Sequence, residues 1–281
     1  MSAALDILEA YLPEPPETGT ALSAEHISLA FGGLQALDDV SITVPTRQLV
    51  GLIGPNGAGK STLFDVINGL RLPDAGEVHL FGQPITRSNA WDRAKLGLSR
   101  TFQSNRVSLE LSVLDNLLAG AHQMIPGSLL GTLFGLPGAR AGERRARQVA
   151  RAVAELLDIA DVADEPVGSL DFGRQRRVEI GRSLMSAPRV LLLDEPAAGL
   201  DSTEAAHLFT LIRRLEADLG LTVLLVEHYV KAVLENCDLV YVLNEGRLIA
   251  AGAPDDIVAH PEVRAAYLGN VIEEVPVDVD A

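Results

Sequence analysis

Short apolar runs alternate with segments of helical periodicity along most of this 281-residue chain. Apolar runs bounded by turn residues predict strands, and they occur at residues 25–31, 38–44, 47–54, 76–82, 96–103, 189–196, 221–228 and 238–246. Residues 244–252 predict a turn that leads into a last strand. Helical spacing of apolar positions predicts helices, and it occurs in residues 60–70, 112–123 and 142–158 and after Gly173. Strands that alternate with helices indicate a parallel sheet, so the predicted fold class is α/β.

Two of the helical segments carry local signals for where they begin and which face they bury. Ser112 is placed to cap the helix at 112–123, and Asp115 follows three positions later in a capping-box-like pattern. We expect one face of the helix at 142–158 to be buried. Its apolar positions are Ala146, Val149, Ala150, Val153 and Leu157. The residues between these helices, 124–142, read as an irregular insert.

Composition and charge narrow the class of protein. With 47% hydrophobic and 22% charged residues the chain is globular, and its net charge of −15 argues against a nucleic-acid partner. The single cysteine, Cys237, excludes an intrachain disulfide, fits a reducing cytoplasm and is expected to be a buried thiol. The apolar stretch 117–139 contains His122, Gln123, two prolines and several glycines, so we do not expect it to span a membrane.

The two ends of the chain differ in composition from the rest. Residues 1–21 lack the basic start and apolar core of a signal peptide, and their Pro and Glu content predicts a flexible extension. Residues 271–281 carry no positive charge and are predicted to form an acidic, flexible tail.

A phosphate-binding loop is predicted at residues 54–61, where GPNGAGKS matches G-x-x-x-x-G-K-[ST] between an apolar strand and a helix. Between a strand and a helix, the backbone N–H groups of such a loop and the N-terminus of the helix favour the binding of phosphate. Lys60 would reach the β- and γ-phosphates, Ser61 would offer its hydroxyl to Mg²⁺, and Thr62 is placed for another phosphate oxygen. The expected nucleotide contacts are Gly54, Pro55, Asn56, Gly57, Ala58, Gly59, Lys60, Ser61 and Thr62.

Two adjacent carboxylates end the apolar strand at 189–196. Asp194 would help to hold Mg²⁺, and Glu195 would polarise the attacking water, as a general base or by orienting it. One Asp–Glu pair is weak evidence by itself. Together with the phosphate loop it indicates a nucleotide hydrolase.

The ordered set of motifs resembles the family of ABC-type ATPases. Gln103 resembles the Q-loop glutamine, which in that family senses Mg²⁺, water and the transport subunit. Residues 170–177 resemble the signature loop, and residues 199–201 resemble part of the D-loop. His228 resembles the switch histidine that contacts the γ-phosphate, and Phe31 the aromatic residue that stacks on adenine. A GTPase would require an N-K-x-D motif, and the sequence has none.

This resemblance implies a fold, an assembly and a set of catalytic residues. The fold is an ABC-type P-loop ATPase over residues 22–270, with a RecA-like core sheet, an N-terminal antiparallel β subdomain and a helical subdomain over residues 104–187. The assembly is a head-to-tail dimer in which each ATP lies between one phosphate loop and the other signature loop. The residues implied to contact ATP from the signature loop and D-loop are Leu170, Asp171, Gly173, Arg174 and Asp201. The catalytic residues implied are Glu195, His228 and Gln103, with Ser61, Gln103 and Asp194 toward the metal.

A narrower resemblance is to the LivG-type ATPases of branched-chain amino acid importers. It is carried by residues 97–103, the insert after His122, residues 175–184, residues 224–228 and residues 252–269. It implies separate transmembrane permeases that dock around residues 103–115, a second, LivF-type ATPase or a second copy of this chain, and an extracytoplasmic solute-binding protein. The chain would then lie on the cytoplasmic face of the inner membrane. Two alternatives stay open: another cargo (lipid export, or urea or amide import), or a soluble ABC ATPase without transport.

Asp171 stands where the family usually has the signature-loop serine. An ionised Asp cannot donate a hydrogen bond to the γ-phosphate and repels it. One interpretation is that Asp171 caps a helix that begins near Gly173, with Arg174 or Arg176 offsetting its charge. The other is asymmetry, in which Asp171 weakens hydrolysis at a partner's site and leaves the Glu195 site of this chain intact.

Overall fold

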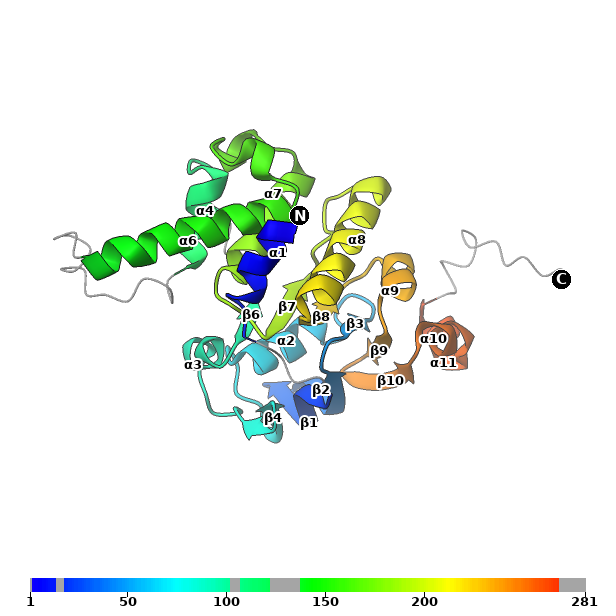
Figure 1. Ribbon diagram of the computed structural model, residues 1–281. Helices are drawn as coiled ribbons and strands as arrows, with labels where there is room; N and C mark the ends of the chain where they lie inside the picture. The colour runs from blue at the N-terminus through cyan, green and yellow to red at the C-terminus, as the bar shows by residue number, and fades with distance from the viewer. Residues whose placement is uncertain (1, 14–17, 102–106, 122–136, 268–281) are drawn as a thin grey trace.

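Two β-sheets and a group of helices make up the computed structural model, which describes residues 2–13, 18–101, 107–121 and 137–267 (Figure 1). An antiparallel sheet has the order β2-β1-β4-β5. Its strands are β1 (Thr20–Phe31), β2 (Leu34–Pro45), β4 (Ala75–Leu80) and β5 (Gln83–Pro84). A six-stranded sheet has the order β10-β9-β3-β8-β7-β6. Its strands are β3 (Leu49–Ile53), β6 (Leu98–Arg100), β7 (Val190–Asp194), β8 (Thr222–Val226), β9 (Leu239–Asn244) and β10 (Arg247–Gly252).

The six-stranded sheet is parallel except for β10, which pairs antiparallel with β9. Its central strands β3, β7 and β8 are buried along their whole length, as expected for strands covered on both faces. The helices that accompany this sheet are α2 (Lys60–Asn68), α3 (Ala90–Lys95), α8 (Ser202–Leu219), α9 (Val230–Asn236), α10 (Pro254–Ala259) and α11 (Pro261–Tyr267). The α/β class with a parallel core sheet and an N-terminal antiparallel sheet is thus confirmed. The short helix α3 was not predicted.

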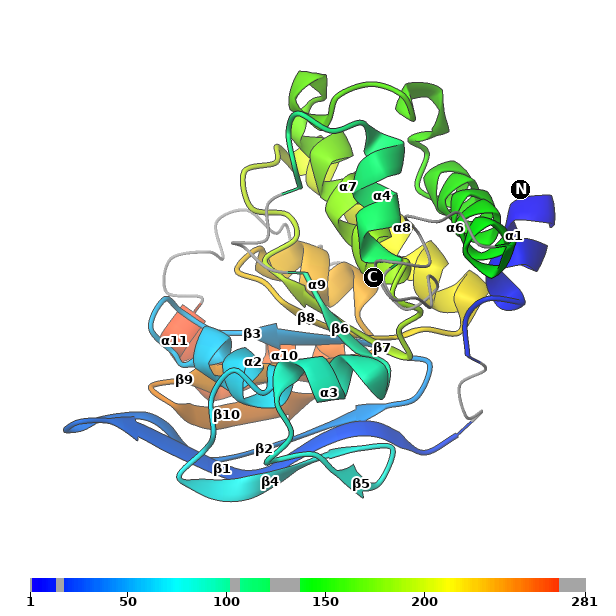
Figure 2. The ribbon, with the colours of Figure 1, turned by 90° about the vertical axis from the view of Figure 1, so that its left-hand side faces the viewer.

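A group of helices lies on the opposite side of the parallel sheet from the antiparallel sheet (Figure 2). It comprises α4 (Val113–Gly120), α6 (Pro137–Leu156), α7 (Phe172–Leu184) and two 3-10 turns, Ala160–Val162 and Val167–Ser169. Ser112 caps α4 by accepting the Asp115 N–H at 3.1 Å. The predicted apolar face of α6 is buried throughout. The cap at Ser112 and the buried apolar face are therefore confirmed. The helix α6 itself begins at Pro137, inside the segment 124–142 that was expected to be irregular, and ends at Leu156.

The hydrophobic core has two parts, one on each face of the parallel sheet. Val50 and Leu52 of β3 face the antiparallel sheet together with Phe64 of α2. Leu49 and Ile53 of the same strand face the helices. This alternation follows from the period of two along a strand, and it places β3 and the loop after it between both cores.

The N-terminal segment differs from the flexible extension expected from its composition. Residues Ser2–Glu9 form helix α1, which packs against α6 and α8 (Figures 1 and 2). Ala4 and Leu8 of α1 and Leu12 just beyond it recur every four residues and are buried, which is the spacing of an apolar helix stripe. The Pro and Glu content of residues 13–17 hid this short pattern. Strand β1 begins at Thr20, two positions before residue 22, where the ATPase domain was expected to begin.

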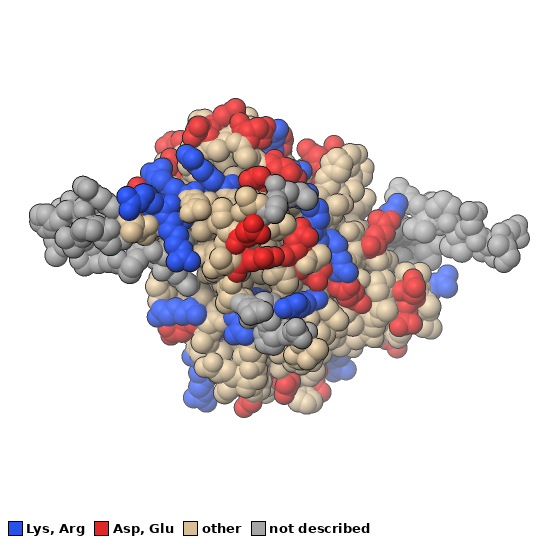
Figure 3. All heavy atoms as spheres, viewed as in Figure 1, with Lys and Arg blue, Asp and Glu red and all other residues tan. Residues whose placement is uncertain are grey.

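Charge is unevenly distributed over the surface. Figure 3 shows Lys and Arg side chains gathered over α6, while Asp and Glu gather over the centre and top of the same face. Arg144, Arg147 and Arg151 of α6 line a groove against Ala3 and Ile7 of α1. The strongly negative net charge therefore coexists with a local basic surface. None of the described helices combines the length and apolar character that crossing a bilayer requires.

Candidate functional site

Two glycines set the backbone conformation of the phosphate loop, which connects β3 to α2. A Cβ on Gly54 would lie 2.2 Å from the Leu243 carbonyl oxygen, and Gly59 has a φ of 103°. Because neither position accepts an ordinary side chain, glycine is required at both. Among the residues that the structure describes, no side chain caps the first turn of α2, so its N–H groups can bind an anion.

Lys60 folds back over the loop from which it projects. Its Nζ donates to the Gly54 carbonyl at 2.6 Å and to the Pro55 carbonyl at 3.1 Å. Burial lowers the pKa of the Lys60 ammonium. Three nearby carboxylates oppose that shift: Glu195, Asp194 and Glu227. The ammonium is thus desolvated, surrounded by oxygen atoms and already directed at the loop.

The order of the parallel strands brings the phosphate loop and two of the predicted catalytic residues, Glu195 and His228, to one edge of the sheet. β3, β8 and β7 are neighbours, and their carboxyl ends lie at the same edge because the strands are parallel. The phosphate loop follows β3, Glu195 follows β7 and His228 follows β8. This is the edge at which ligands bind in open α/β sheets.

Asp194 is almost fully buried, and its two carboxylate oxygens differ. Oδ2 accepts a hydrogen bond from Arg100 Nη2 at 2.6 Å. Oδ1 is buried and has no hydrogen-bond partner among the described residues. A buried acceptor of this kind requires a partner, and carboxylate oxygens together with substrate phosphates are ligands that Mg²⁺ prefers. The residues present therefore fit a magnesium ion brought in with a nucleotide.

No cluster of three His, Cys, Asp or Glu side chains suited to a metal occurs within the described ranges. A metal bound here would take ligands from the nucleotide as well as from the protein, which is the usual mode for Mg²⁺. Ser61, the hydroxyl predicted for the metal, lines the cavity beside Lys60. Gln103, the third residue predicted for the metal, lies outside the described residues.

Glu195 takes a left-handed backbone conformation, with a φ of 47°. Its N–H donates to the Val226 carbonyl at 2.9 Å, which ties the turn after β7 to β8. Positive φ is uncommon outside glycine and concentrates at functional sites. Its position after β7 makes Glu195 part of the wall of the cavity that contains Lys60.

That cavity has a volume of about 550 Å³ and contains the whole distal half of the phosphate loop. Its lining residues are Phe31, Leu34, Gln35, Ala36, Asn56, Gly57, Ala58, Gly59, Lys60, Ser61, Thr62, Glu195, Glu245 and Gly246. Phe31 is 41% exposed at the rim, with the Arg71 guanidinium 4.8 Å from its ring centroid. The predicted adenine-stacking residue therefore lies on the same cavity as the phosphate loop.

Glu227 is a buried acidic residue at this edge that was not predicted. Its side chain is fully buried; Oε1 accepts the Ala197 N–H at 2.7 Å and Oε2 accepts the His228 N–H at 3.1 Å. Burial raises the pKa of the Glu227 carboxyl, and these backbone N–H bonds oppose the shift. The carboxylate links the loop after Glu195 to the loop of His228. The sequence did contain a signal for Glu227, because it is a charged residue directly after the apolar run of β8.

The signature-loop residues lie away from the Lys60 cavity. Asp171 caps α7 by accepting the Arg174 N–H at 2.7 Å, so the predicted cap is confirmed, and the helix begins at Phe172. Arg174 Nε is 3.7 Å from Asp171 Oδ2, whereas Arg176 pairs with Glu179 at 2.6 Å. Arg174 rather than Arg176 thus offsets the Asp171 charge.

A second cavity of about 390 Å³ brings the signature loop together with the start of α8. Asp171, Gly173 and Arg174 line it, together with Glu204. Asp201 caps α8 in a capping box with Glu204. One chain therefore carries two separate groups of predicted nucleotide contacts, one at each cavity.

Comparison with known proteins places the fold and the site in one family. The ABC transporter family model matches residues 37–198, which include the phosphate loop and Glu195. The chain is a member of the ABC transporter ATPase family. A second model, of the branched-chain amino acid ATP-binding cassette transporter, matches residues 247–272. Membership in this family assigns nucleotide binding and ATP hydrolysis to the chain.

Three ATP-binding proteins match most of this chain and nearly all of their own length. The branched-chain amino acid transport ATP-binding protein BraF of Pseudomonas aeruginosa is 39% identical over 88% of this chain and 97% of BraF. LivG of Escherichia coli is 37% identical over the same shares. LptB, a lipopolysaccharide export ATP-binding protein of Acidithiobacillus ferridurans, is 38% identical over 89% of this chain and 97% of LptB.

A solved ATP-binding cassette of an ABC transporter in its ADP conformation has a TM-score of 0.77 to this ABC ATPase. Its sequence is 35% identical, and the match covers 90% of this chain and 100% of that structure. The predicted ABC-type fold is therefore confirmed. Membership in a transporter family also implies membrane permease partners for this chain.

Proposed function

We propose that this chain binds ATP with Mg²⁺ in the Lys60 cavity and powers the uptake of branched-chain amino acids through separate permeases. The observation that carries the proposal is the meeting of Lys60, Asp194, Glu195 and His228 at one sheet edge, in a chain whose residues 247–272 match a branched-chain amino acid transporter model.

The phosphate loop and Lys60 would bind the triphosphate. Lys60 would exchange its bonds to the Gly54 and Pro55 carbonyls for bonds to phosphate oxygens, which carry more negative charge. Ser61 and Asp194 would hold Mg²⁺, with Gln103 as a third contributor. When bound, the metal supplies positive charge that neutralises the phosphates during transfer.

Glu195 would orient and polarise the attacking water. Its carboxylate borders the cavity, and a base in that position accepts a proton as the oxygen attacks. His228, with its side chain 56% exposed and 3.6 Å from Glu227 Oε2, would contact the γ-phosphate. Phe31 would stack on adenine at the rim.

The second cavity would act on a partner's nucleotide. Since Leu170, Asp171, Gly173, Arg174 and Asp201 lie apart from Lys60, they are suited to an ATP bound by another subunit in a head-to-tail dimer. That subunit is a LivF-type ATPase in this proposal. A solute-binding protein would deliver the amino acid, and the chain would lie on the cytoplasmic face of the inner membrane.

The test is reconstitution of the chain with its co-purifying membrane subunits in vesicles, followed by uptake of labelled leucine. We expect ATP-dependent uptake, and its loss in Glu195→Gln with ATP binding retained. Glu77→Gln, an exposed carboxylate on β4, is the matched control and should transport normally. ATP hydrolysis stimulated by a lipid instead of by an amino acid would replace the proposal with lipid export, the second candidate suggested by the relative LptB.

A further inference from the structure

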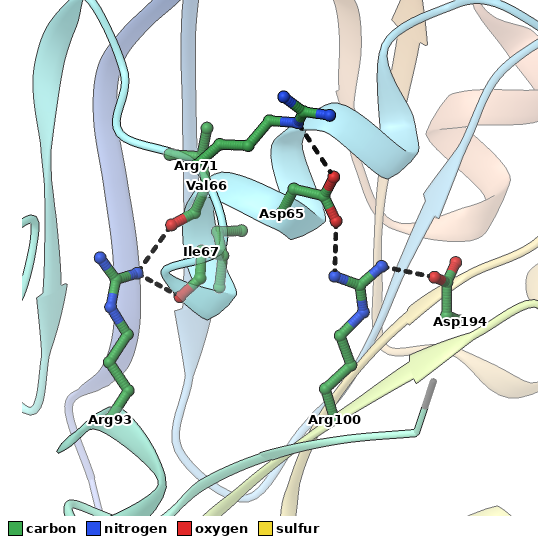
Figure 4. Close-up of polar contacts among 7 residues, drawn as sticks. All are labelled: Asp65, Val66, Ile67, Arg71, Arg93, Arg100 and Asp194. Carbon is green, nitrogen blue, oxygen red and sulfur yellow. Dashed lines mark hydrogen bonds and ion pairs between the residues drawn. The ribbon is translucent and has the colours of Figure 1, made fainter. Parts of the chain in front are cut away.

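Arg100 joins two carboxylates on different elements beside the candidate nucleotide site (Figure 4). Its Nη2 donates to Asp194 Oδ2 at 2.6 Å, and its Nη1 donates to Asp65 Oδ1 at 2.8 Å. Arg100 is the last residue of β6, Asp65 lies in α2 and Asp194 ends β7. One guanidinium therefore connects the helix of the phosphate loop to the end of β7.

The surroundings of Arg100 fix its position closely. Its side chain is 6% exposed, and its guanidinium lies 5.6 Å from the ring centroid of buried Phe64. Asp65 accepts a second contact from Arg71 Nε at 3.3 Å. A planar guanidinium between two carboxylates has few alternative orientations, so the side chain is a rigid connection.

The backbone next to this connection is equally constrained. Arg100 pairs with Leu192 in the parallel ladder of β6 and β7. Thr101 N–H donates to the Leu192 carbonyl at 2.9 Å, and Asp194 N–H donates to the Thr101 hydroxyl at 3.3 Å. The donor Arg100 and the acceptor Asp194 are thus held in fixed register.

Arg100 consequently decides which way the Asp194 carboxylate faces. With Oδ2 bound to Arg100, Oδ1 is turned away from the guanidinium (Figure 4) and stays without a hydrogen-bond partner among the described residues. A carboxylate held through one oxygen presents the other in a defined direction. Partners that orient ligand groups in this way typically change metal affinity by about 10–100-fold.

We propose that Arg100 is a positioning residue that presents Asp194 Oδ1 to the Mg²⁺ of bound ATP. This inference rests on the proposed function, since it requires a nucleotide with its metal at this site. Asp65 is the second anchor that keeps the guanidinium in place.

The charge of Arg100 acts in the opposite direction, because a cation near a metal ligand repels the metal. The contacts favour positioning over repulsion. The charge of Arg100 is already balanced by two carboxylates within hydrogen-bond distance, so orientation rather than net charge should dominate.

The experiment measures how much Mg²⁺ strengthens ATP binding, with a fluorescent ATP analogue, in excess Mg²⁺ and in EDTA. Glu195→Gln serves as the background so that the nucleotide is not hydrolysed. The ratio of the two affinities is the coupling between metal and nucleotide. We expect Arg100→Met to lower this ratio by about tenfold and to leave affinity in EDTA unchanged. Arg100→Lys should also lower the ratio, because one ammonium cannot bridge both carboxylates, but by less than Arg100→Met because the positive charge is kept.

Asp65→Asn should also lower the ratio, and combining it with Arg100→Met should add nothing, because both changes break the same connection. The matched control is Arg93→Met. Arg93 is also buried and donates to the carbonyls of Val66 and Ile67 in α2, but it does not contact Asp194. This variant should lower the melting temperature and leave the ratio unchanged.

The outcomes distinguish the role of Arg100 from the magnesium site and from the proposed function. An unchanged or increased ratio in Arg100→Met and Arg100→Lys, with a metal effect present in the unmodified chain, overturns the role of Arg100 alone. Absence of any metal effect on ATP binding in the unmodified chain overturns the magnesium site as well. Absence of ATP binding overturns the proposed function.

Discussion

Glu195 and Glu227 show how single residues are placed by contacts from other elements. The left-handed turn at Glu195 is held by the Val226 carbonyl of β8. The segment just after it is held by Glu227, which accepts the Ala197 N–H. A conformation that costs free energy in isolation persists where surrounding bonds over-determine it. Glu195, the carboxylate proposed to polarise water, is therefore positioned by β8 as much as by its own strand.

The buried hydrogen bond of the Tyr11 hydroxyl can be tested by measuring stability at different pH values. Its hydroxyl donates to the Met185 carbonyl at 2.5 Å, and burial raises the pKa of Tyr11 from 10.0 to about 12, partly opposed by Arg145. A raised folded-state pKa means that the stabilisation is complete below pH 10 and is lost as the pH rises toward 12. At pH 8 we expect Tyr11→Phe to be less stable than the unmodified chain by about 1 kcal/mol.

The measurement is urea unfolding of both chains at pH 8 and at pH 11. The difference between them should shrink or reverse at pH 11, because only the unmodified chain carries the phenol. All other titrating groups are shared, so they cancel in the comparison. A difference that stays constant over this range would show that the phenol does not titrate differently in the folded chain.

Among the elements, β3 and α9 approach each other at a glycine. A Cβ on Gly51 would lie 2.4 Å from Val233 Cγ1 and 3.2 Å from Cys237 Sγ. Cys237 is buried, as predicted, and burial raises the pKa of its thiol to about 12. The strand that leads into the phosphate loop is thus packed directly against a helix, with no room for one more methyl group.

Gly51→Ala should therefore lower the free energy of unfolding by about 1–3 kcal/mol through overpacking. Adding Val233→Ala should restore part of the lost free energy of unfolding, since the nearest clashing atom is then removed. Gly33→Ala is the control: no atom lies within 4 Å of its added Cβ, and a change within about 0.5 kcal/mol is expected. Equal stability of Gly51→Ala and Gly33→Ala in denaturant unfolding would contradict the close approach.

At the scale of the whole molecule, the predicted nucleotide contacts of this chain fall into two sets, at two separate cavities. Lys60 and Glu195 line one, and Asp171 and Arg174 line the other. In a head-to-tail assembly each set serves a different ATP. Under the proposed assembly, the departure at Asp171 would affect a partner's site, whereas Lys60, Ser61 and Glu195 would act on the ATP bound by this chain.

Asp171→Ser in the assembled complex should raise hydrolysis at the partner's site by about tenfold, the rate equivalent of roughly 1.4 kcal/mol, because a donor replaces a repelling carboxylate. Serine also caps helices, so α7 is preserved. Asp171→Asn separates loss of charge from gain of the hydroxyl. Hydrolysis is measured with the catalytic glutamate of each subunit disabled in turn. Equal partner-site rates for all three chains would remove the asymmetry hypothesis.

The sequence alone determined features whose physics is local. The phosphate loop, the caps at Ser112 and Asp171 and the buried face of α6 depend on residues within a turn or two of one another, and all were predicted in place. The α/β class followed from periodicity, which each element carries by itself. Helix α1 had such a signal in Ala4, Leu8 and Leu12, but the pattern was short.

Only the tertiary structure decided which distant residues meet. Arg100 and Asp194 are 94 positions apart, and Tyr11 and Met185 are 174 apart. The partners of Glu227, the two faces of β3 and the position of α1 on α6 likewise depend on strand order and packing. Local patterns set each element and its motif, because helix and turn energies act between near neighbours. The orientation of the Asp194 carboxylate arises only when three elements pack around one buried guanidinium.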